Sequence, residues 1–414
     1  MARTDKAIQV NGRNYAWPSQ PLVAVCIDGS EPDYIENAIA AGVMPVVGEM
    51  VQSGADLRVD CVVPSFTNPN NLSIVTGVPP VIHGICGNYF YDRETDTEVM
   101  MNDPKYLRAG TLLAAFADAG ASVAVVTAKD KLRTLLGHGL YYGNGRAICF
   151  SAERADIATS DDNGISNALG YVGLPMASVY SSRLSEFVFV AGVKLMAEKR
   201  PDLMYLSTTD YIQHKYAPGT KEANAFYAMM DGYLGQLLAQ GAIVALTADH
   251  GMNAKHHFDG SPKVIYLQDI LDNWLGVGIA RVILPITDPY IVHHGALGSF
   301  ATAYLSNGVD PTDVINNLKN LSGIECVLDR ADGCQEFELP EDRMGDLIIV
   351  SQKDTALGGM AEDHDLSGLN EPLRSHGGLG EQTVPLIFSR PIDVVGGRRV
   401  RNFDLFDLAL NHTA

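Results

Sequence analysis

Carboxylate, imidazole and ammonium side chains directly follow several short apolar runs of this chain. The residues in these positions are Asp28, Lys129, Asp210 with His214, and Asp249 with His250. If the apolar runs are strands of an open parallel sheet, their carboxyl ends lie at one edge, which is where such sheets bind ligands. Carboxylates that meet there without a cation would repel one another, and some would stay protonated. A divalent metal ion removes this conflict, so the pattern predicts a metal site.

The spacing of these residues supports the metal interpretation. On a helix, Asp210 and His214 would lie on the same face, where both can reach one ion. Asp249 and His250 would be adjacent ligands on a loop. His376 could complete a site, because the two glycines after it allow the backbone to approach closely. Mixed nitrogen and oxygen ligands favour zinc, with manganese or iron as alternatives.

Each of these features has a simpler explanation when it stands alone. A single aspartate after a strand is usually a helix cap or a turn residue. An Asp-x-x-x-His pair on a helix is more often a surface pair than a ligand pair, and Asp-His-Gly is a weak motif. The metal prediction therefore depends on the joint occurrence of these residues, in this order and at these strand ends.

Thr67 is the candidate nucleophile. It stands in the segment 64–71 and precedes the apolar stretch 72–75, which can open a helix. A hydroxyl at the positive end of a helix is favoured as an alkoxide, and a metal ion would lower its pKa further. The alternative is that Thr67 is simply the N-cap, which is the commoner fate of threonine before a helix.

The elements that must position these residues alternate between strands and helices. Strands are predicted at 22–27, 123–126, 203–206, 243–247 and 384–388, and helices at 111–119, 187–198 and 223–238. A further amphipathic helix is expected after the first strand, with Ile35, Ile39, Val43 and Val47 on one side and Gly54 beyond its end. An Asn-Gly pair predicts a hairpin over 8–17. This alternation favours an α/β fold with a mostly parallel central sheet and helices on both faces.

A less regular pattern begins near residue 262 and ends near residue 366. It predicts strands at 301–305 and 346–351 and a helix at 312–320. We expect an inserted α+β domain over 262–366, within a core formed by 1–261 and 367–414.

Composition limits the classes of function. Lys and Arg total 30 against 49 Asp and Glu, which gives a net charge of −19, while 46% of residues are hydrophobic and 19% are charged. These values exclude general disorder and make a nucleic-acid partner unexpected, because such binders need a basic face. No apolar run is long enough for a membrane span, and no signal peptide is visible. The six scattered cysteines predict free thiols in a reducing compartment, so we expect a cytoplasmic protein.

The candidate residues, taken in chain order, resemble the signature of a known family. The set comprises Asp28, Thr67, Asp210, His214, Asp249, His250 and His376. It resembles the alkaline phosphatase superfamily, and the motifs at 64–69 and 76–84 are similar to its nucleotide pyrophosphatase/phosphodiesterase branch. Within that branch the resemblance is to phosphonoacetate hydrolases. It implies an alkaline phosphatase-like core and identifies the inserted span with the cap domain of such enzymes.

The resemblance also implies roles for individual residues. It assigns one zinc ion to Asp28, Thr67, Asp249 and His250, and a second to Asp210, His214 and His376. Asn88 aligns with the family asparagine that binds a non-bridging phosphoryl oxygen. The implied reaction is hydrolysis of a small anion, phosphonoacetate, to acetate and phosphate through a phospho-threonine intermediate on Thr67.

Carbon is a poor leaving group, so this reaction needs cations beside the substrate carboxylate to stabilise the developing enolate charge. Lys129 and Lys131 are the candidates, because alternate residues of an extended segment point the same way. The alternative is a solvated surface pair. His214 is a further candidate contact to the substrate while it binds zinc.

Other functions remain open at this stage. The same metal site would serve a nucleotide or alkyl phosphodiesterase, a two-metal phosphomutase, or a metal-binding protein without catalysis. His256 and His257 are expected on the surface or in loops, as are His293 and His294, whose roles are open together with those of His83 and His138. The sequence does not fix the oligomeric state, and a homodimer is left open.

Overall fold

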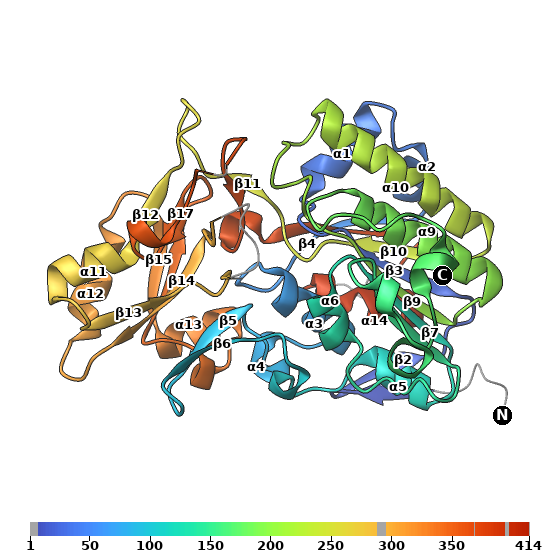
Figure 1. The fold of residues 1–414 in the computed structure, drawn as a ribbon, viewed down its shortest axis with the longest axis horizontal. Helices are drawn as coiled ribbons and strands as arrows, with labels where there is room; N and C mark the ends of the chain where they lie inside the picture. Colours follow the sequence, from blue (N-terminus) through green and yellow to red (C-terminus); the bar gives the residue numbers. More distant parts are fainter. Residues whose placement is uncertain (1–6, 288–294, 368, 394–396, 414) are drawn as a thin grey trace.

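A seven-stranded sheet forms the centre of the larger part of the molecule (Figure 1). The structure is a computed structural model that describes residues 7–287, 295–367, 369–393 and 397–413. In spatial order the strands are β4 (Ala55–Asp60), β19 (Thr383–Phe388), β10 (Ile243–Thr247), β3 (Leu22–Cys26), β9 (Leu203–Ser207), β7 (Val123–Thr127) and β8 (Ala147–Ser151). Strand β19 is antiparallel to both neighbours, and the others run in one direction. The predicted mostly parallel sheet is confirmed.

Helices cover both faces of this sheet, as predicted (Figure 1). The side chains of β3 alternate between two apolar cores, with Val23 and Val25 in one and Leu22 and Ala24 in the other. The first core is covered by α1 (Pro32–Ala40), α2 (Pro45–Ser53), α9 (Arg183–Glu198) and α10 (Lys221–Ala239). The second is covered by α3 (Thr67–Thr76), α5 (Leu112–Asp118), α6 (Asp130–Leu136) and α14 (Leu405–Asn411). The short helices are α4 (Pro80–His83), α7 (Ser160–Asn163) and α8 (Ala168–Val172).

The helix expected to run from Ile35 to Val47 is wrong, because this span forms parts of two helices, α1 and α2. Gly42 adopts a left-handed φ of 72°, and Pro45 is the first residue of α2. Proline inside a helix would lose a backbone hydrogen bond and clash with the preceding turn, so it is favoured at the first position. The apolar spacing across this span therefore continues through a turn.

The span between residues 262 and 366 contains a separate antiparallel sheet, on the left of Figure 1. Its strands, in spatial order, are β13 (Ala280–Ile283), β14 (Phe300–Leu305), β16 (Leu347–Ser351) and β15 (Ile324–Asp329). Its helices are α11 (Leu267–Leu275), α12 (Pro311–Lys319) and α13 (Arg330–Phe337). The two strands and the helix predicted here are confirmed. The domain boundaries themselves stay predictions.

Two short strand pairs lie where the chain enters and leaves this span, one just outside it and one just inside it. Strand β11 (Asn253–Ala254) pairs antiparallel with β18 (Arg374–Ser375). Strand β12 (Val264–Tyr266) pairs in parallel with β17 (Ala356–Gly358). The first pairing brings the chain back beside the segment that follows β10, and so determines where His376 lies.

The hairpin predicted near the N-terminal end of the described residues is confirmed. Strands β1 (Ala7–Val10) and β2 (Arg13–Ala16) are antiparallel. Asn11 and Gly12 adopt positive φ angles of 48° and 80°, as the tight turn between twisted strands requires.

A second hairpin was not predicted. Strands β5 (Tyr89–Asp92) and β6 (Thr97–Met100) pair antiparallel. The ring of Tyr91 meets the ring of Tyr304 of β14 edge-on, with centroids 4.9 Å apart. The hairpin therefore packs against the smaller sheet, and Asn88 lies directly before its first strand.

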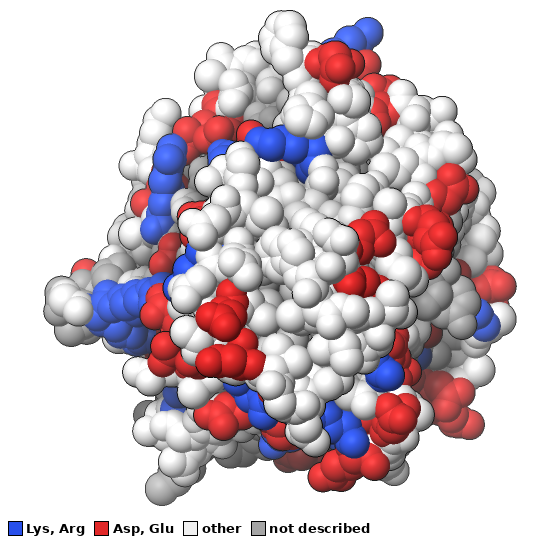
Figure 2. Space-filling view, turned by 90° about the vertical axis from the view of Figure 1, so that its left-hand side faces the viewer, with Lys and Arg blue, Asp and Glu red and all other residues white. Residues whose placement is uncertain are grey.

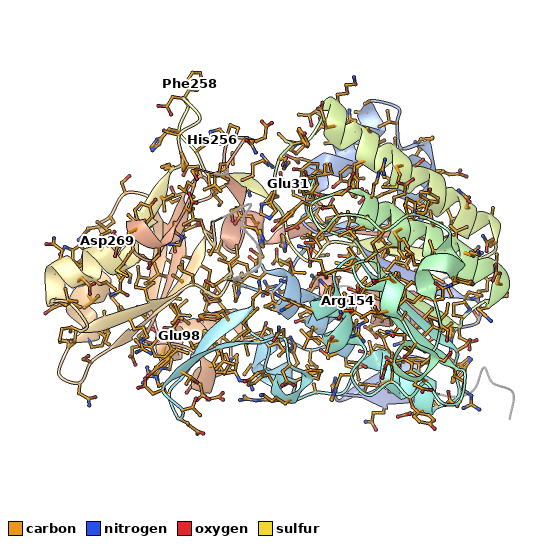
Figure 3. All side chains as sticks on the ribbon, in the orientation of Figure 1. Glu31, Glu98, Arg154, His256, Phe258 and Asp269 are labelled. Carbon is orange, nitrogen blue, oxygen red and sulfur yellow. The ribbon has the colours of Figure 1, made fainter. Side chains whose placement is uncertain are left out.

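The surface carries charges of both signs. On the face shown in Figure 2, Lys and Arg side chains are interspersed with Asp and Glu and form no continuous basic surface. His256 and the fully exposed Phe258 lie on a loop that projects from the smaller part of the molecule (Figure 3). Within the described residues, no helix combines the length and apolar character needed to cross a membrane.

Candidate metal and phosphoryl site

Three donor side chains meet where two neighbouring strands end. Asp28 follows β3, and Asp249 and His250 follow β10, which lies beside β3 in parallel. All three are buried, and one ligand atom from each lies within 4.8 Å of the others. We call these three residues the first group. The sheet register alone brings them together, as the strand-end argument expects.

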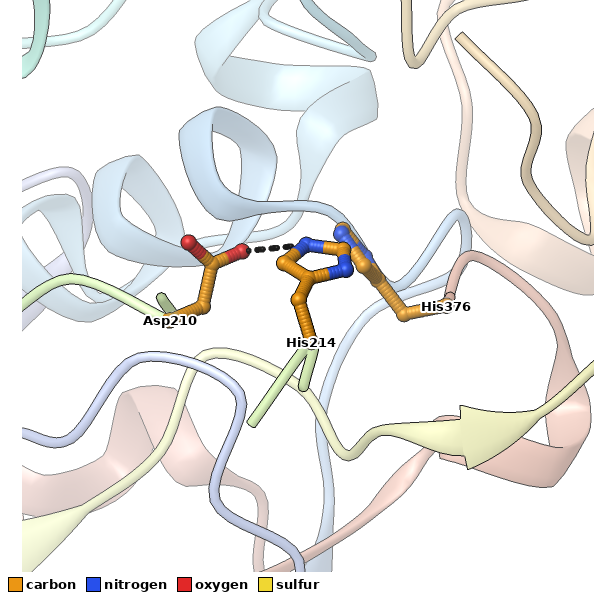
Figure 4. A group of neighbouring side chains, drawn as sticks. All are labelled: Asp210, His214 and His376. Carbon is orange, nitrogen blue, oxygen red and sulfur yellow. Dashed lines mark ion pairs between the residues drawn. The ribbon is translucent and has the colours of Figure 1, made fainter. Parts of the chain in front are cut away.

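A second group consists of Asp210, His214 and His376, shown in Figure 4. Asp210 Oδ2 lies 2.9 Å from His214 Nε2. The helix expected for these two residues is wrong, because they lie in a turn. One hydrogen bond from His214 N to Asp210 O, at 3.0 Å, nevertheless gives them the one-turn spacing that the sequence predicted.

The two groups adjoin. The imidazoles of His250 and His376 stack with their centroids 3.6 Å apart and an interplanar angle of 3°. The ring of His214 lies 5.6 Å from that of His376. The six donors therefore form one continuous site, although the roles of these residues as metal ligands stay predictions.

Backbone carbonyls orient the three imidazoles. His214 Nδ1 lies 2.8 Å from Arg374 O, and His376 Nδ1 lies 2.8 Å from Ser65 O. His250 Nδ1 lies 2.8 Å from the carbonyl of the next residue, Gly251. A carbonyl only accepts, so each Nδ1 must donate, and in the neutral imidazole this leaves Nε2 with its lone pair. Metal-binding histidines are held in this way.

Without a metal ion, the buried charges of the two groups are unfavourable. Burial raises the pKa of Asp28 well above its ordinary value, and the carboxylates of Asp210 and Asp249 add to the effect. Burial likewise raises the pKa of Asp249. Burial would lower the pKa of His250, but Asp249 and Asp28 outweigh it and raise that pKa to about 9. Burial, with His250 and His214 nearby, lowers the pKa of His376 well below its usual range. Divalent cations would relieve this repulsion.

Thr67 is the first residue of α3 and not its N-cap. The N-cap is Phe66, and no side chain caps the helix. Thr67 Oγ1 lies 3.3 Å from His250 Nε2 and 3.5 Å from Asp28 Oδ1. The N-cap alternative is therefore wrong, and the hydroxyl faces the first group.

Asn71 and Tyr205 support the first group, and the sequence did not reveal them. Asn71 Nδ2 donates to Asp249 Oδ2 at 2.9 Å and to the carbonyl of Thr67 at 3.0 Å. The hydroxyl of Tyr205, on β9, donates to Asn71 Oδ1 at 2.8 Å. Asn71 lies one helical turn after Thr67, and this spacing was the available signal.

A pocket of about 140 Å³ opens beside the first group. Of the predicted residues, its walls include Asp28, Thr67, Asn88, Lys129 and Lys131. The other lining residues are Asn68, Met100, Asn102, Leu132, Glu153, Val179, Tyr180 and Thr208, none of them predicted. Thr208 follows β9 directly, so its strand-end position could have identified it.

Lys129 and Lys131 line this pocket for a different reason from the one expected. Lys129 is the N-cap of α6 and Lys131 lies in its first turn, so the extended segment is wrong. Lys129 Nζ lies 3.6 Å from Asp210 Oδ1. Glu153 Oε2 accepts the backbone N–H of Asp130 at 2.7 Å, which anchors the start of this helix beside the pocket.

The remaining histidines lie outside both groups. His83 is fully buried, its Nδ1 accepts from Ile85 N at 3.1 Å, and its Nε2 lies 2.9 Å from Ser73 Oγ. These two contacts give both ring nitrogens of His83 a partner inside the protein, so we interpret His83 as a residue of the core. His138 is exposed on the surface. His293 and His294 lie outside the described residues.

Comparison with known proteins places this site in a family. The sequence pattern of type I phosphodiesterases/nucleotide pyrophosphatases matches residues 22–379, which include both groups, the inserted segment and every strand of the larger sheet except β19. The chain belongs to the type I phosphodiesterase/nucleotide pyrophosphatase family. The human ectonucleotide pyrophosphatase/phosphodiesterase family member 1 is 24% identical over 268 residues, which cover 61% of this chain and 25% of that protein.

Within the family, this chain is similar to phosphonoacetate hydrolases. The crystal structure of phosphonoacetate hydrolase from Sinorhizobium meliloti 1021 with phosphonoformate is 58% identical and matches with a TM-score of 0.96. The structure of that enzyme with phosphonoacetate is 57% identical at the same TM-score. Both matches cover 100% of each chain. Phosphonoacetate hydrolase of Penicillium oxalicum is 57% identical over 46 residues, 10% of this chain and 64% of that sequence.

The resemblance drawn from the sequence motifs is thus confirmed. A more distant structure, murine ectonucleotide pyrophosphatase/phosphodiesterase 5, is 18% identical with a TM-score of 0.63 and covers 96% of each chain. It shows the shared fold alone.

All six cysteines of the chain are free thiols, as predicted.

Proposed function

We propose that this protein hydrolyses the carbon–phosphorus bond of phosphonoacetate to acetate and phosphate, with two zinc ions and a phospho-threonine intermediate. The observation that carries the proposal is the full-length likeness, at 57% identity, to a structure in complex with phosphonoacetate. The arrangement of Thr67, Asn88, Lys129 and Lys131 around one pocket supports it.

Two divalent ions fit the donor groups. We assign one ion to Asp28, Asp249, His250 and the Thr67 oxygen, and the other to Asp210, His214 and His376. The buried carboxylates need a cation, and each imidazole presents Nε2 because its Nδ1 faces a carbonyl. Such ions polarise the phosphoryl group and favour the ionised hydroxyl. The donors suit zinc, and manganese or iron would also fit.

Thr67 carries the first chemical step. Its position at the N-terminus of α3 favours negative charge on Oγ1. Attack forms the bond between Oγ1 and phosphorus and breaks the bond between phosphorus and carbon, and the electron pair stays with the leaving carbon. Water then hydrolyses the phospho-threonine, which releases phosphate and restores the hydroxyl. Asn88 orients the phosphoryl group through its amide.

Lys129 and Lys131 stabilise the leaving group. The electron pair on carbon delocalises into the adjacent carboxylate as an enolate, which becomes acetate when its carbon is protonated. Ammonium groups beside that carboxylate lower the energy of this charge in the transition state. Both side chains line the pocket that contains Thr67. His214, whose Nε2 lies 2.9 Å from Asp210 Oδ2, is a further candidate contact to the substrate.

A phosphodiesterase is the second candidate. Val179 and Tyr180 give the pocket an apolar and aromatic wall, which a nucleotide base or an alkyl ester could occupy. A diesterase has no need of two lysines for a substrate carboxylate, so the lysines favour the phosphonate.

One assay separates the two. The purified protein is tested for phosphate release from phosphonoacetate and for nitrophenol release from a nitrophenyl phosphodiester, before and after chelation. We expect phosphate from phosphonoacetate, loss of activity on chelation, and recovery with zinc. Absence of phosphate release from phosphonoacetate by the zinc-loaded protein would overturn the proposal, and activity that survives complete metal removal would overturn the mechanism.

We further propose a cytoplasmic location, supported by the six free thiols. We assign a small anionic substrate to this site. A homodimer stays a prediction, which sedimentation of the pure protein would test.

A further inference from the structure

A buried ion pair lies just beyond the metal site. Lys255 Nζ donates to Glu381 Oε1 at 2.8 Å, and neither side chain is exposed to solvent. Lys255 Nζ also donates to the carbonyl of Lys353 at 2.7 Å. Removing two charges from water is unfavourable, and replacing such a pair with apolar residues is often neutral for stability. The pair therefore calls for an explanation other than fold stability.

The contacts of Glu381 supply that explanation. Its Oε2 accepts the backbone N–H of Gly378 at 3.1 Å, and its Oε1 also accepts from Asn253 Nδ2 at 2.8 Å. Its own carbonyl accepts the backbone N–H of Gly251 at 2.8 Å. One residue thus binds the two loops that carry the histidines of the site.

These two loops determine the spacing between the two groups. Gly251 directly follows His250 of the first group, and Gly378 stands two residues after His376 of the second. The stacked rings of His250 and His376, 3.6 Å apart, are the point where the groups meet. A shift of either loop would change the distance between the two proposed metal positions.

We propose that Glu381 is a positioning residue that fixes the second group against the first, and that Lys255 holds its carboxylate in place. The inference rests on the metal site of the proposed function. Lys255 also donates to the carbonyl of Lys353 in the inserted span. The same buried hydrogen-bond network therefore joins the core to the insertion.

The test is the zinc affinity of the Glu381→Gln variant, measured by competition with a chromophoric chelator. The amide nitrogen of glutamine donates and cannot accept. One of the two positions that the carboxylate oxygens of Glu381 occupy therefore loses its hydrogen bonds. We expect one of two zinc equivalents to bind about 10- to 100-fold more weakly, the range typical of residues that orient ligands. The melting temperature of the metal-free protein is measured in parallel.

Asp231→Asn is the matched control. Asp231 is a buried carboxylate that accepts the backbone N–H groups of Val46 and Val47, at 3.1 and 2.8 Å, and it takes no part in either group. It should lower the melting temperature of the metal-free protein and leave both zinc affinities unchanged.

Glu381→Asp is a second variant in case the first does not fold. It keeps the charge for Lys255 but withdraws the carboxylate from Gly378, so weaker binding of one zinc equivalent is again expected. If either folded variant binds two zinc ions as tightly as the unmodified protein, the positioning role is wrong. If the unmodified protein itself binds no zinc, the metal assignment fails instead, and the two failures are distinguishable.

Discussion

The two donor groups are assembled in different ways. The first group, Asp28 with Asp249 and His250, follows two strands that are hydrogen-bonded neighbours in the sheet. In the second group, Asp210 and His214 follow β9, but His376 arrives only after the inserted span, beyond β18. Register in the sheet fixes the first group. The loop of His376 is instead held by hydrogen bonds: His376 Nδ1 lies 2.8 Å from Ser65 O, His376 O accepts from Ser299 N at 2.9 Å, and Glu381 Oε2 accepts from Gly378 N at 3.1 Å. The second group should therefore be the more easily disturbed.

The largest expected effect is that of Thr67→Ala. Removal of the attacking hydroxyl should lower kcat at least about 10³-fold, because no other group forms the intermediate. The donors of both groups remain, so two zinc equivalents should still bind, although Thr67 faces the first group. Stopped phosphate release with full metal content is the expected pair of results. Thr67→Ser, which keeps a hydroxyl, is the control, and an active alanine variant would contradict the nucleophile assignment.

His376→Ala tests the difference between the groups most directly. It should remove one zinc equivalent and lower kcat/KM by about 10²-fold or more, because one side of the phosphoryl group loses its cation. The first group should keep its ion, since the sheet holds Asp28 and Asp249 independently. Metal analysis after dialysis gives the count. Loss of both ions would show that the groups are not separable.

Lys129→Met should have a smaller effect, a lower kcat/KM that comes mainly from kcat, because the contact strengthens as charge develops on the substrate carboxylate. Loss of one charged contact to the substrate carboxylate corresponds to about 1.5–3 kcal/mol, or about 10- to 100-fold. Lys129 lies beside Asp210 of the second group, so zinc affinity is measured alongside the kinetics. Lys105→Met removes an exposed lysine outside the pocket and should change neither value. An unchanged kcat/KM in Lys129→Met would contradict the role proposed for this lysine at the substrate carboxylate.

His83 shows how a buried histidine behaves outside both groups. Burial lowers its pKa to about 3, from an ordinary value of 6.5. The unfolded chain then binds a proton that the folded protein does not, so stability falls as the pH drops from 6.5 towards 3. This contribution amounts to about 2 kcal/mol between pH 6.5 and pH 5.

His83→Gln should remove that part of the acid sensitivity while leaving zinc binding unchanged. Urea unfolding of both proteins at pH 6.5 and pH 5 gives the comparison. Glutamine cannot satisfy both Ile85 and Ser73, so some loss of stability at neutral pH is expected as well. An equal fall in stability for both proteins would show that His83 is not the residue responsible.

Much of the first group could be predicted from short-range patterns. Apolar runs buried on both faces identify parallel strands, and parallel strands present their carboxyl-end residues at one edge. Asp28 and Asp249 follow from that rule. The break between α1 and α2 was missed because apolar spacing continued through Gly42, although Pro45 was a visible signal.

Other features depend on contacts between distant segments and could not be read locally. The support of Asn71 by Tyr205 joins residues 134 positions apart and has no short-range signature. The hairpin that carries Met100 is local, but its turn lacks the Asn-Gly pair that predicts the first hairpin. The lysine pair was predicted for the wrong reason, since only Lys129 has an extended backbone and Lys131 already lies in the first turn of α6.

The fold class and the resemblance to the phosphonoacetate hydrolases could be predicted from residue type, order and local periodicity, and the same patterns supplied the candidate donor residues. Only the tertiary structure decided how the donors divide into two adjoining groups, that Thr67 faces the first of them, and that Glu381 connects the loops of His250 and His376. Such arrangements depend on where the chain returns after the insertion. That position is set by packing and hydrogen bonds between segments far apart in sequence.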